Sequence, residues 1–267
     1  MNVANRVAVV TGAGSGIGRA LAHALAQREC HLFLVDINPR GLNQTLEQVT
    51  RYGVRVAGQP LDVTDATAVN ALPAAVLTVH GRVDLLINNA GIASGGTFEQ
   101  LSEADFDRII DVNFGAVVQL TRCFLPHLHQ RDDARLVYLS SLYGLIAPPE
   151  QTAYSASKFA VRGFANALRH ELARSTVGVT VVHPGGVATN IARHARVPKG
   201  ATESEIRQKL AAHEKKLRMA PEQAAELIVR GIERNKSRIL VGNDARFIAW
   251  LERLLPVSYW TVLQKLM

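Results

Sequence analysis

The sequence predicts an α/β fold: one Rossmann-type domain in which a doubly wound parallel sheet of about seven strands carries helices on both faces. Short apolar runs rich in valine, leucine and isoleucine alternate with longer segments whose apolar residues recur at helical spacing. The first run leads directly into a glycine-rich turn and an amphipathic segment. The 267 residues, 48% of them hydrophobic, include no low-complexity stretch, linker or repeat. We therefore expect residues 1–267 to form a single domain.

The first predicted strand is the apolar run at residues 7–11, and a helix is expected at residues 19–26. Between them, Gly12, Gly16 and Gly18 follow a G-x-x-x-G-x-G spacing. Glycine lets the backbone turn tightly and approach a pyrophosphate, whose charge then faces the free N–H groups at the helix N-terminus. The loop therefore indicates a dinucleotide site, with a flexible turn as the alternative.

The second predicted strand, residues 31–35, ends at Asp36. A carboxylate at this point binds the hydroxyls of the adenosine ribose and repels the additional 2′-phosphate of NADP, so Asp36 indicates NAD. Arg19 and Arg40 are the nearby cations that could reach a 2′-phosphate. The alternative role of Asp36 is to cap the helix that follows.

Two further strands are predicted, at residues 55–61 and 83–87. After the third strand, Asp62 could cap the helix at residues 66–80, for which Thr64 offers a second cap. After the fourth strand, Asn88 is followed by Asn, Ala and Gly, and such small residues let the chain pass beneath a cofactor. We expect Asn88 to be mainly structural, tying neighbouring strands together, and residues 89–91 to form a wall of the cofactor site.

A long helix is expected from about residue 102, with acidic residues in its first turn, as the helix dipole favours. Asn113 lies in the middle of this helix and shares a face with Ile109, Ala116 and Leu120. An amide buried there must find hydrogen-bond partners. The spacing alone fits a satisfied core asparagine and a functional one equally well.

The helix predicted at residues 151–175 places Tyr154 and Lys158 on one face, one turn apart. A cation within a few ångströms favours the phenolate, which lowers the phenol pKa and suits acid–base chemistry on an alcohol or a carbonyl. Ser141 follows the fifth predicted strand, residues 136–139, and its hydroxyl could hold a substrate oxygen in the same space. A solvated helix with a chance tyrosine and lysine is the alternative.

Five motifs, in this order, resemble the short-chain dehydrogenase/reductase family: residues 11–18, 88–91, Ser141, 154–158 and 184–189. The resemblance covers about the first 190 residues. The catalytic residues that it implies are Asn113, Ser141, Tyr154 and Lys158. It also implies that Asn113 distorts its helix and holds a water that links the catalytic lysine to solvent. The cofactor contacts that it implies are Gly12, Ser15, Gly16, Ile17, Gly18, Asp36, Asp62, Val63, Asn89, Ala90, Gly91, Tyr154, Lys158, Pro184, Gly185, Val187 and Thr189.

The resemblance gives some of these residues particular tasks. Asp62 and Val63 correspond to a pair that contacts adenine. The backbone N–H of Val187 and the hydroxyl of Thr189 correspond to groups that bond the nicotinamide carboxamide. Relatives that prefer NADP tend to carry a basic residue in the glycine loop or directly after the acidic residue of the second strand, and this chain carries neither. NAD is therefore the expected cofactor, and NADP is less favoured.

A sixth strand is predicted at residues 177–183 and a last strand at residues 238–241, with a helix from residue 221 to about residue 235. Residues 190–220 correspond to the mobile substrate lid of the family, where its members diverge most, so the substrate is not readable. On the helix that carries Tyr154, a stripe of small residues indicates an interface: Ala156, Ala160, Gly163 and Ala167. The sheet-facing residues are expected to be Phe159, Phe164 and Leu168. We expect a homodimer or homotetramer that uses this helix and the one with Asn113.

The segment at residues 243–267 is an apolar tail that contains both tryptophans of the chain. Glu252 and Arg253 interrupt it, so it is not a membrane span. Three interpretations remain: packing on the domain or a partner subunit, a cover over the entrance for a lipophilic substrate, or a helix lying in a membrane interface.

The net charge of +7 arises entirely in the C-terminal part, because residues 1–189 carry 15 basic and 15 acidic residues whereas residues 190–267 carry 15 and 8. No aromatic-interleaved basic strand or zinc-finger spacing accompanies this charge, so we expect no nucleic-acid partner. A solvated basic face and attraction to an anionic substrate or lipid surface are the remaining interpretations. Peripheral membrane contact follows from the second of these.

Cys30 and Cys123 lie in separate predicted elements without a C-x-x-C or C-x-x-H neighbour, so no disulfide or zinc site is expected. No cluster of histidine, cysteine and aspartate suggests any other metal site. The sequence shows no export signal, and we expect a cytoplasmic protein with reduced thiols.

These observations favour an NAD-dependent oxidoreductase that interconverts a secondary or primary alcohol and its ketone or aldehyde. Its substrate is expected to be a small alcohol or carbonyl compound, with a lipophilic one suggested by the tail. Two alternatives stay open: an NADP-dependent carbonyl reductase, and a dinucleotide-sensing scaffold without chemistry. The intact set of Ser, Tyr, Lys and Asn argues against the scaffold.

Overall fold

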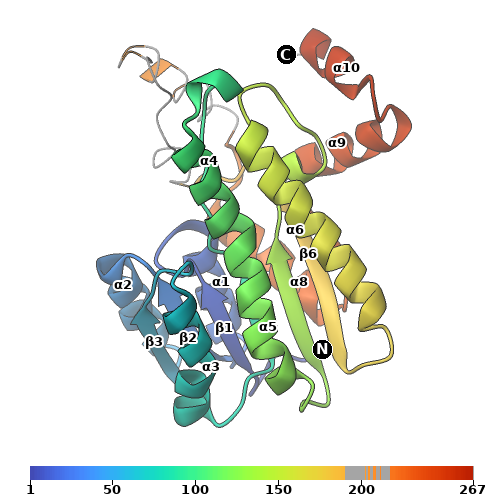
Figure 1. The fold of residues 1–267 in the computed structure, drawn as a ribbon. Coiled ribbons are helices and arrows are strands. Elements are labelled where there is room, and N and C mark those ends of the chain that lie inside the picture. The colour runs from blue at the N-terminus through green and yellow to red at the C-terminus, as the bar shows by residue number, and fades with distance from the viewer. Residues whose placement is uncertain (190–201, 203, 205–206, 209–210, 212–216, 267) are drawn as a thin grey trace.

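Seven parallel strands form one sheet in the order β3-β2-β1-β4-β5-β6-β7 in the computed structural model (Figure 1). The structure describes residues 1–189 and 217–266, with residues 202, 204, 207, 208 and 211 between them. The strands are β1 (Val7–Thr11), β2 (His31–Asp36), β3 (Val56–Pro60), β4 (Leu85–Asn88), β5 (Ala134–Leu139), β6 (Val177–Pro184) and β7 (Arg238–Val241). The chain begins in the middle of the sheet, winds outward to β3 and returns to wind outward through β4 to β7. The predicted doubly wound fold is confirmed.

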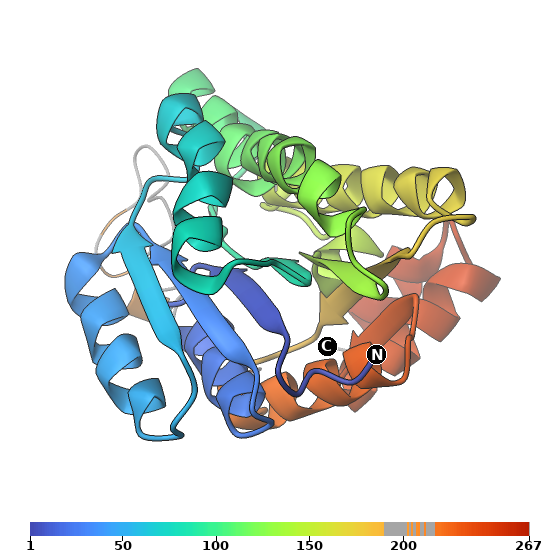
Figure 2. The same cartoon turned by 90° about the horizontal axis from the view of Figure 1, so that it is seen from below.

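Two helical layers cover the sheet, as Figure 2 shows from below. One layer holds α1 (Gly16–Ala26), α2 (Pro39–Thr50) and α8 (Pro221–Glu233). The other holds α3 (Ala66–His80), α5 (Ala116–Leu128) and α6 (Thr152–Glu171). Successive strand residues point to opposite faces, so that Val9 joins the core under α3, α5 and α6 whereas Val10 joins the core under α1 and α8. This burial on both faces explains the continuous apolar runs.

The helix that contains Asn113 is interrupted by a π turn. It begins as α4 (Glu103–Ile110), widens over Asp111–Gly115 and continues as α5. Asn113 is buried within this turn. A π turn inside a helix commonly marks a functional position. The expected distortion of the helix is therefore present.

The residues considered as alternative helix caps do not cap α2 or α3. The side chain that caps α2 is Asn38, which accepts a hydrogen bond from the Gly41 N–H, so Asp36 is not the cap. The side chain that caps α3 is Asp65, which accepts from the Ala68 N–H, rather than Asp62 or Thr64. In both places the cap is the polar residue directly before the first helical residue, as N-cap geometry requires.

One side of α6 also differs from the prediction. Phe159, expected to face the sheet, is 38% exposed, and its ring lies 6.0 Å from the guanidinium of Arg162. Leu168 is buried and Phe164 packs against the core as expected, and Val161 and Ala165 complete the buried face. Within this single chain the stripe of small residues remains on the surface, with Ala160 half-buried and the other members exposed. The proposed subunit interface stays a prediction.

The tail forms two helices, α9 (Asn243–Leu254) and α10 (Tyr259–Leu266). Ile248 and Leu251 of α9 and Leu263 of α10 are buried in a small cluster with Ile146. Other apolar residues of α9 point away from the domain, so its apolar residues divide between an inner and an outer face. Within the described ranges no helix is both long and apolar enough to cross a membrane. Most of the predicted lid, residues 190–201 and much of 203–216, lies outside the described residues.

Candidate active site

The carboxyl ends of β1 and β4 meet at the point where the strand order reverses, which is where ligands bind in doubly wound sheets. The glycine loop follows β1 directly. Gly12 and Gly16 have φ angles of +66° and +51°, in the left-handed region that favours glycine. A Cβ on Gly18 would lie 2.0 Å from the Gly12 carbonyl oxygen, so α1 can begin tightly against the loop only with glycine there.

The N-terminus of α1 is open to an anion. The side chain of Ser15, its N-cap, is exposed and makes no capping hydrogen bond, and the first turn of α1 holds no acidic residue. Ile17 packs its side chain against the core, which leaves its backbone at the loop. The free N–H groups of a helix start attract a phosphate. The loop and helix therefore fit a pyrophosphate, as the spacing predicted.

Asn89 holds the glycine loop to the end of β4. Its Nδ2 donates to the carbonyl oxygens of Thr11, at 2.8 Å, and of Gly12, at 3.2 Å. The backbone N–H groups of Asn89 and Ala90 both donate to the Thr11 hydroxyl at 3.0 Å. The amide of the buried Asn88 has no partner in the described structure, so the strand-tying role expected of Asn88 belongs to Asn89.

Asp36 reaches the glycine loop from the end of β2. Its Oδ2 accepts from the Gly14 N–H at 2.7 Å and its Oδ1 from the Asn38 N–H at 2.8 Å. The carboxylate is half-buried and retains lone pairs for further donors. Arg19 donates to Thr45 and Gly41, whereas Arg40 is exposed. Asp36 therefore stands where a ribose would lie beside the loop.

The pair expected to contact adenine has other partners. Asp62 Oδ2 accepts from Arg108 at 2.8 Å, and its Oδ1 accepts from the backbone N–H and the hydroxyl of Thr64. The side chain of Val63 is buried in the core. Only the remaining carboxylate lone pairs of Asp62 and the backbone of this pair are left to face a ligand.

Three of the predicted catalytic side chains converge at the ends of β5 and α6. Ser141 follows β5, and its Oγ accepts from the Tyr143 N–H at 3.1 Å, which starts the short turn Leu142–Gly144. The Lys158 amine lies 5.7 Å from the centre of the Tyr154 ring. Lys158 is only 4% exposed and donates to the Leu139 carbonyl oxygen at 3.0 Å. Tyr143 packs edge-on against Tyr154, with ring centres 6.1 Å apart.

The titration of this pair differs from the prediction. Burial raises the pKa of Tyr154 to about 12, while a hydrogen bond with Ser141 acts in the opposite direction. Burial lowers the pKa of Lys158 to about 8. The expected fall of the phenol pKa is thus absent, because removal from water disfavours the charged form of each group. At neutral pH both groups are protonated, Tyr154 as the phenol and Lys158 as the ammonium.

Asn113 connects this site to the loop after β4. Its Oδ1 accepts from the Ile92 N–H at 2.8 Å, and its Nδ2 donates to the Ile92 carbonyl oxygen at 2.9 Å. A Cβ on Gly91 would lie 3.1 Å from Asn113 Oδ1 and 3.3 Å from Lys158 Nζ. Gly91 therefore adjoins both side chains, which brings the wall after β4 next to the catalytic set.

Sequence reasoning missed four supporting residues, each of which acts through a contact between segments distant in sequence. Ser157 Oγ lies 3.0 Å from Asn113 Nδ2, and Ser140 Oγ donates to the Lys158 carbonyl oxygen at 2.9 Å. A Cβ on Gly144 would lie 2.8 Å from that same carbonyl oxygen. The buried His183, whose pKa burial lowers to about 4, has Nδ1 3.0 Å from the Ser141 carbonyl oxygen. Two of these residues could have been noticed in the sequence: Ser140, because it adjoins Ser141, and Ser157, because it lies within the Tyr-x-x-x-Lys motif.

The loop after β6 faces the glycine loop. A Cβ on Gly16 would lie 3.2 Å from Cγ2 of Thr189. Pro184 closes β6, and Gly185 approaches Asp244 of α9. The Val187 N–H donates to the Gly185 carbonyl oxygen at 2.9 Å, so this donor, expected to be available to a carboxamide, is already bonded in the structure.

Comparison with known proteins identifies the family. A family model described as short chain dehydrogenase matches residues 6–199, which is more than half of the chain. The chain belongs to the short-chain dehydrogenase/reductase family. This short-chain dehydrogenase is 44% identical to SadH of Mycobacterium tuberculosis, a protein described as an oxidoreductase, over 95% of this chain and 92% of that protein. It is therefore an oxidoreductase of this family.

A second relative and a solved structure agree. The chain is 32% identical to a dehydrogenase/reductase SDR family protein 7-like of Anopheles gambiae, over 97% of this chain and 82% of the relative. A short-chain dehydrogenase/reductase from Burkholderia phymatum, solved in complex with NAD, superposes with a TM-score of 0.89 at 30% identity, over 96% of this chain and 95% of that one. In the described part of this dehydrogenase, no group of three or more His, Cys, Asp and Glu could hold a metal ion.

Proposed function

We propose that this dehydrogenase transfers hydride between NAD and a substrate that alternates between a secondary or primary alcohol and its ketone or aldehyde. One observation carries the proposal: Ser141, Tyr154 and Lys158 meet at the edge of the sheet where the glycine loop and Asp36 also lie. The open start of α1 and the glycine loop fit the pyrophosphate of a dinucleotide. NAD supplies the hydride acceptor when it is bound.

In the reduction direction, the phenol of Tyr154 gives its proton to the carbonyl oxygen of the substrate. In the oxidation direction, the phenol proton first leaves toward solvent, and the phenolate then takes the proton of the substrate hydroxyl. Ser141 holds the substrate oxygen and stabilises the charge that develops on it. Lys158 is protonated at neutral pH because its pKa is about 8, and its charge favours the phenolate form of Tyr154. Asn113 positions Lys158 and Tyr154 through Ser157, and we assign it the proton path to solvent.

Asp36 supports NAD over NADP. Its carboxylate is fixed on both oxygens by backbone N–H groups and stands beside the loop. A negative charge there repels the 2′-phosphate of NADP. Arg19, one of the two nearby cations, is directed to backbone and side-chain oxygens of α2 rather than left free. The alternative of an NADP-dependent reductase would depend on the exposed Arg40 alone.

A lipophilic substrate is supported by the surroundings of Tyr154. The ring of Tyr143 packs against it, and Tyr143 and Leu142 belong to the same apolar cluster as α10 of the tail. Tyr259 of α10 accepts a hydrogen bond from the Ala147 N–H at 3.1 Å. We propose that α10 walls the substrate side of the site. Assembly as a homodimer or homotetramer, cytoplasmic location, the lid at residues 190–220 and peripheral membrane contact remain part of the proposal.

The reaction is tested by following NAD reduction with alcohols of graded chain length and ring size, and NADP reduction with the same panel. We expect NAD-dependent turnover that is greatest with long or cyclic alcohols. Dinucleotide binding, seen as a cofactor fluorescence change, without turnover of any alcohol or carbonyl compound would favour the non-catalytic scaffold. Turnover with NADP alone would favour the reductase.

A further inference from the structure

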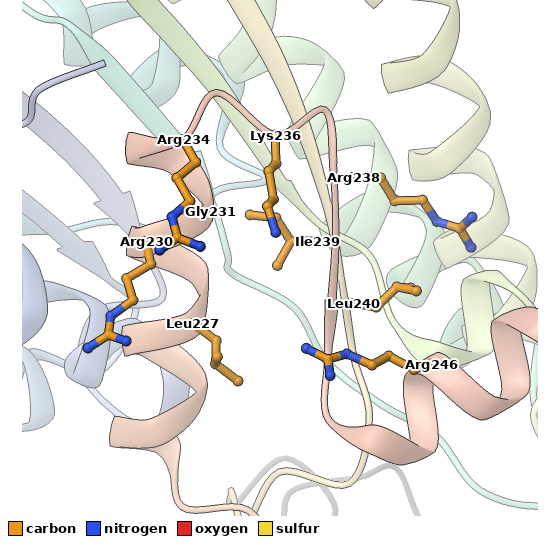
Figure 3. A pocket seen from close by; sticks show the side chains of 9 residues that line it. All are labelled: Leu227, Arg230, Gly231, Arg234, Lys236, Arg238, Ile239, Leu240 and Arg246. Atoms are coloured by element: carbon orange, nitrogen blue, oxygen red, sulfur yellow. The ribbon is translucent and has the colours of Figure 1, made fainter.

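A groove of about 340 Å³ lies between α8, β7 and the start of α9, away from the residues of the candidate active site (Figure 3). Of the nine residues that line it, five are cationic and none is acidic. The cationic residues are Arg230, Arg234, Lys236, Arg238 and Arg246. They come from the end of one helix, the turn and edge strand that follow it, and the start of another helix. The fold therefore brings together positive charges that are separated in the sequence.

Most of this charge is not neutralised by neighbours. Arg230 pairs with Glu226, which also pairs with Arg28. Arg234, Lys236 and Arg246 are exposed and form no ion pair or side-chain hydrogen bond in the described structure. In Figure 3 the side chains of Arg234, Lys236 and Arg246 extend over the groove. Holding like charges together costs free energy, which an anionic partner would recover.

Arg238, another cation of the groove, also lies near other positive charges. Burial lowers its pKa, and the nearby charges of Arg162 and Arg253 lower it further, with Glu252 acting in the opposite direction. Arg253 stands on α9, two turns after Arg246, so it shares a face with a groove residue. The cationic surface therefore continues from the groove along α9.

The floor of the groove is apolar. Leu227 of α8 is exposed within it, and Ile239 of β7 lies beneath it. A Cβ on Gly231 would lie 2.3 Å from Cδ1 of Ile239, so glycine at this position lets the helix and the strand approach and shapes the floor. A cationic rim over apolar side chains fits a ligand with an acidic head and a hydrocarbon body better than a simple ion.

Next to this rim, α9 presents an apolar outer face. Phe247 is 46% exposed, Trp250 is 59% exposed and Leu254 is 56% exposed. Positions 247, 250 and 254 recur at helical spacing, and Arg246 and Arg253 flank them. Exposed tryptophan and leucine beside arginine are the composition of a helix that lies in a membrane interface.

We propose that the groove and the outer face of α9 together dock this protein on an acidic lipid surface. The cations attract anionic headgroups, and the apolar side chains of α9 enter the boundary between headgroups and acyl chains. A second copy of the chain is a poorer occupant, because a symmetric contact through the edge strand β7 would place one set of cations opposite another. The inference deepens the peripheral membrane contact of the proposed function but does not rest on the proposed reaction, so its test needs no substrate.

The test measures co-sedimentation with vesicles of phosphatidylcholine alone and of phosphatidylcholine with phosphatidylserine, at low and high salt. We expect binding only to the acidic vesicles, and its loss at about 0.5 M salt, where charges are screened over a few ångströms. The double variant Arg234→Glu with Arg246→Glu should reduce binding by about tenfold or more. Arg51→Glu with Arg174→Glu is the control, because these arginines are exposed elsewhere and the net charge changes equally.

Insertion of the apolar face is measured separately. In a Trp260→Phe variant, Trp250 is the remaining tryptophan of the chain. Its fluorescence should shift to shorter wavelength with acidic vesicles and be quenched by brominated acyl chains.

Equal vesicle binding by the two double variants would overturn the proposal. So would saturable binding of inorganic phosphate in the groove without vesicle binding, or a change of oligomeric state in the groove variant with vesicle binding unchanged.

Discussion

Asn113 Nδ2 donates a hydrogen bond to Ser157 Oγ across 3.0 Å, and Ser157 Oγ in turn donates to the Tyr154 carbonyl oxygen at 2.7 Å. The same Asn113 amide bonds both backbone groups of Ile92. The π turn at residues 111–115 thus ties the loop after β4 to the helix that carries Tyr154 and Lys158. Asn113 is thus a satisfied buried amide, and in the proposed mechanism the same hydrogen bonds make it a positioning residue.

Removal of the middle member of this network should loosen the site. Ser157→Ala leaves Asn113 Nδ2 with one partner fewer, and we expect a loss of about 1 kcal/mol in the free energy of unfolding together with a lower kcat at unchanged NAD affinity. Chemical denaturation and steady-state kinetics measure the two effects. Ser155→Ala is the matched control, because Ser155 is buried on the same helix and its hydroxyl has no partner in the described structure. Equal effects of the two variants would contradict a positioning role.

The arrangement of strands and the main site residues could be predicted from the sequence because their signals are local. Apolar runs fix the strands, glycine spacing fixes the loop, and the Tyr-x-x-x-Lys spacing fixes a helix face. Contacts such as His183 with Ser141, or Asn89 with Thr11, depend on strand order and register, which no local pattern specifies. The actual caps, Asn38 and Asp65, were missed for the opposite reason, since several polar residues within four positions of each helix start offered the same local signal.

The direction of the pKa shifts was also beyond sequence reasoning. A lysine one turn from a tyrosine lowers the phenol pKa only where the attraction of its charge outweighs the cost of removing the phenolate from water. Here burial is the largest influence on Tyr154 and on Lys158. The exposure of Phe159 was also not predictable from local spacing. Tertiary packing buries Val161 and Ala165 on one face of α6, and this turns Phe159 toward the surface.

Tyr154→Phe should abolish turnover while NAD affinity changes by less than a few-fold, because the ring still packs but the transferable proton is gone. Stopped-flow kinetics and a cofactor titration measure these quantities. Tyr143→Phe is the control, since it changes the other ring of the same edge-on pair. A Tyr154→Phe variant that keeps more than about a tenth of kcat, a loss below about 1.4 kcal/mol of transition-state stabilisation, would show that another group moves the proton.

Lys158→Met should stabilise the ligand-free protein while abolishing activity. The folded-state pKa of Lys158, about 8, is below its ordinary value of 10.5, so the unfolded chain binds this proton more tightly. The penalty on folding is complete below pH 8 and fades as the pH rises toward the unfolded pKa. We expect a gain of up to about 3 kcal/mol at pH 7 that falls to about 1 kcal/mol at pH 10.

Urea denaturation at both pH values measures the stability of the Lys158→Met variant. Lys236→Met is the control, because it removes the same charge from an exposed side chain. A gain for Lys158→Met that is equal at the two pH values would indicate better apolar packing rather than relief of a buried amine.

Asp36→Ala should weaken NAD binding and admit NADP, because the charge that repels a 2′-phosphate is removed. The variant also loses the acceptor for the Gly14 N–H, so some loss of stability is expected. Asp65→Ala, which removes the cap of α3, provides a comparable structural loss at a residue that is not among the expected cofactor contacts. Cofactor selectivity that changes equally in both variants, or equal kcat/KM for NAD and NADP in the unsubstituted enzyme, would contradict the role of Asp36.

The tail should affect substrate choice through α10 rather than through α9. Trp260 and Tyr259 pack in the cluster that contains Ile146 and Tyr143, beside Tyr154. Trp260→Ala opens this wall, and we expect kcat/KM to change selectively for long-chain or polycyclic alcohols while short alcohols are turned over as before. The measurement is the ratio of kcat/KM for a long and a short alcohol, which is insensitive to the fraction of folded enzyme.

Trp250→Ala is the matched control. Trp250, the other tryptophan of the chain, lies on the outer face of α9, so its loss should affect vesicle binding and leave the substrate ratio unchanged.

Deletion of residues 247–267 distinguishes a tail that only stabilises the fold from a tail that also walls the substrate site. A purely structural tail predicts a lower melting temperature and equal losses for small and large alcohols, since burial of Leu263 and its neighbours contributes about 1.5–3 kcal/mol for each large apolar side chain. A tail that walls the site leaves a folded, dinucleotide-binding enzyme whose loss is confined to the large substrates. Uniform loss in the deletion together with an unchanged substrate ratio in Trp260→Ala would assign the tail to packing alone.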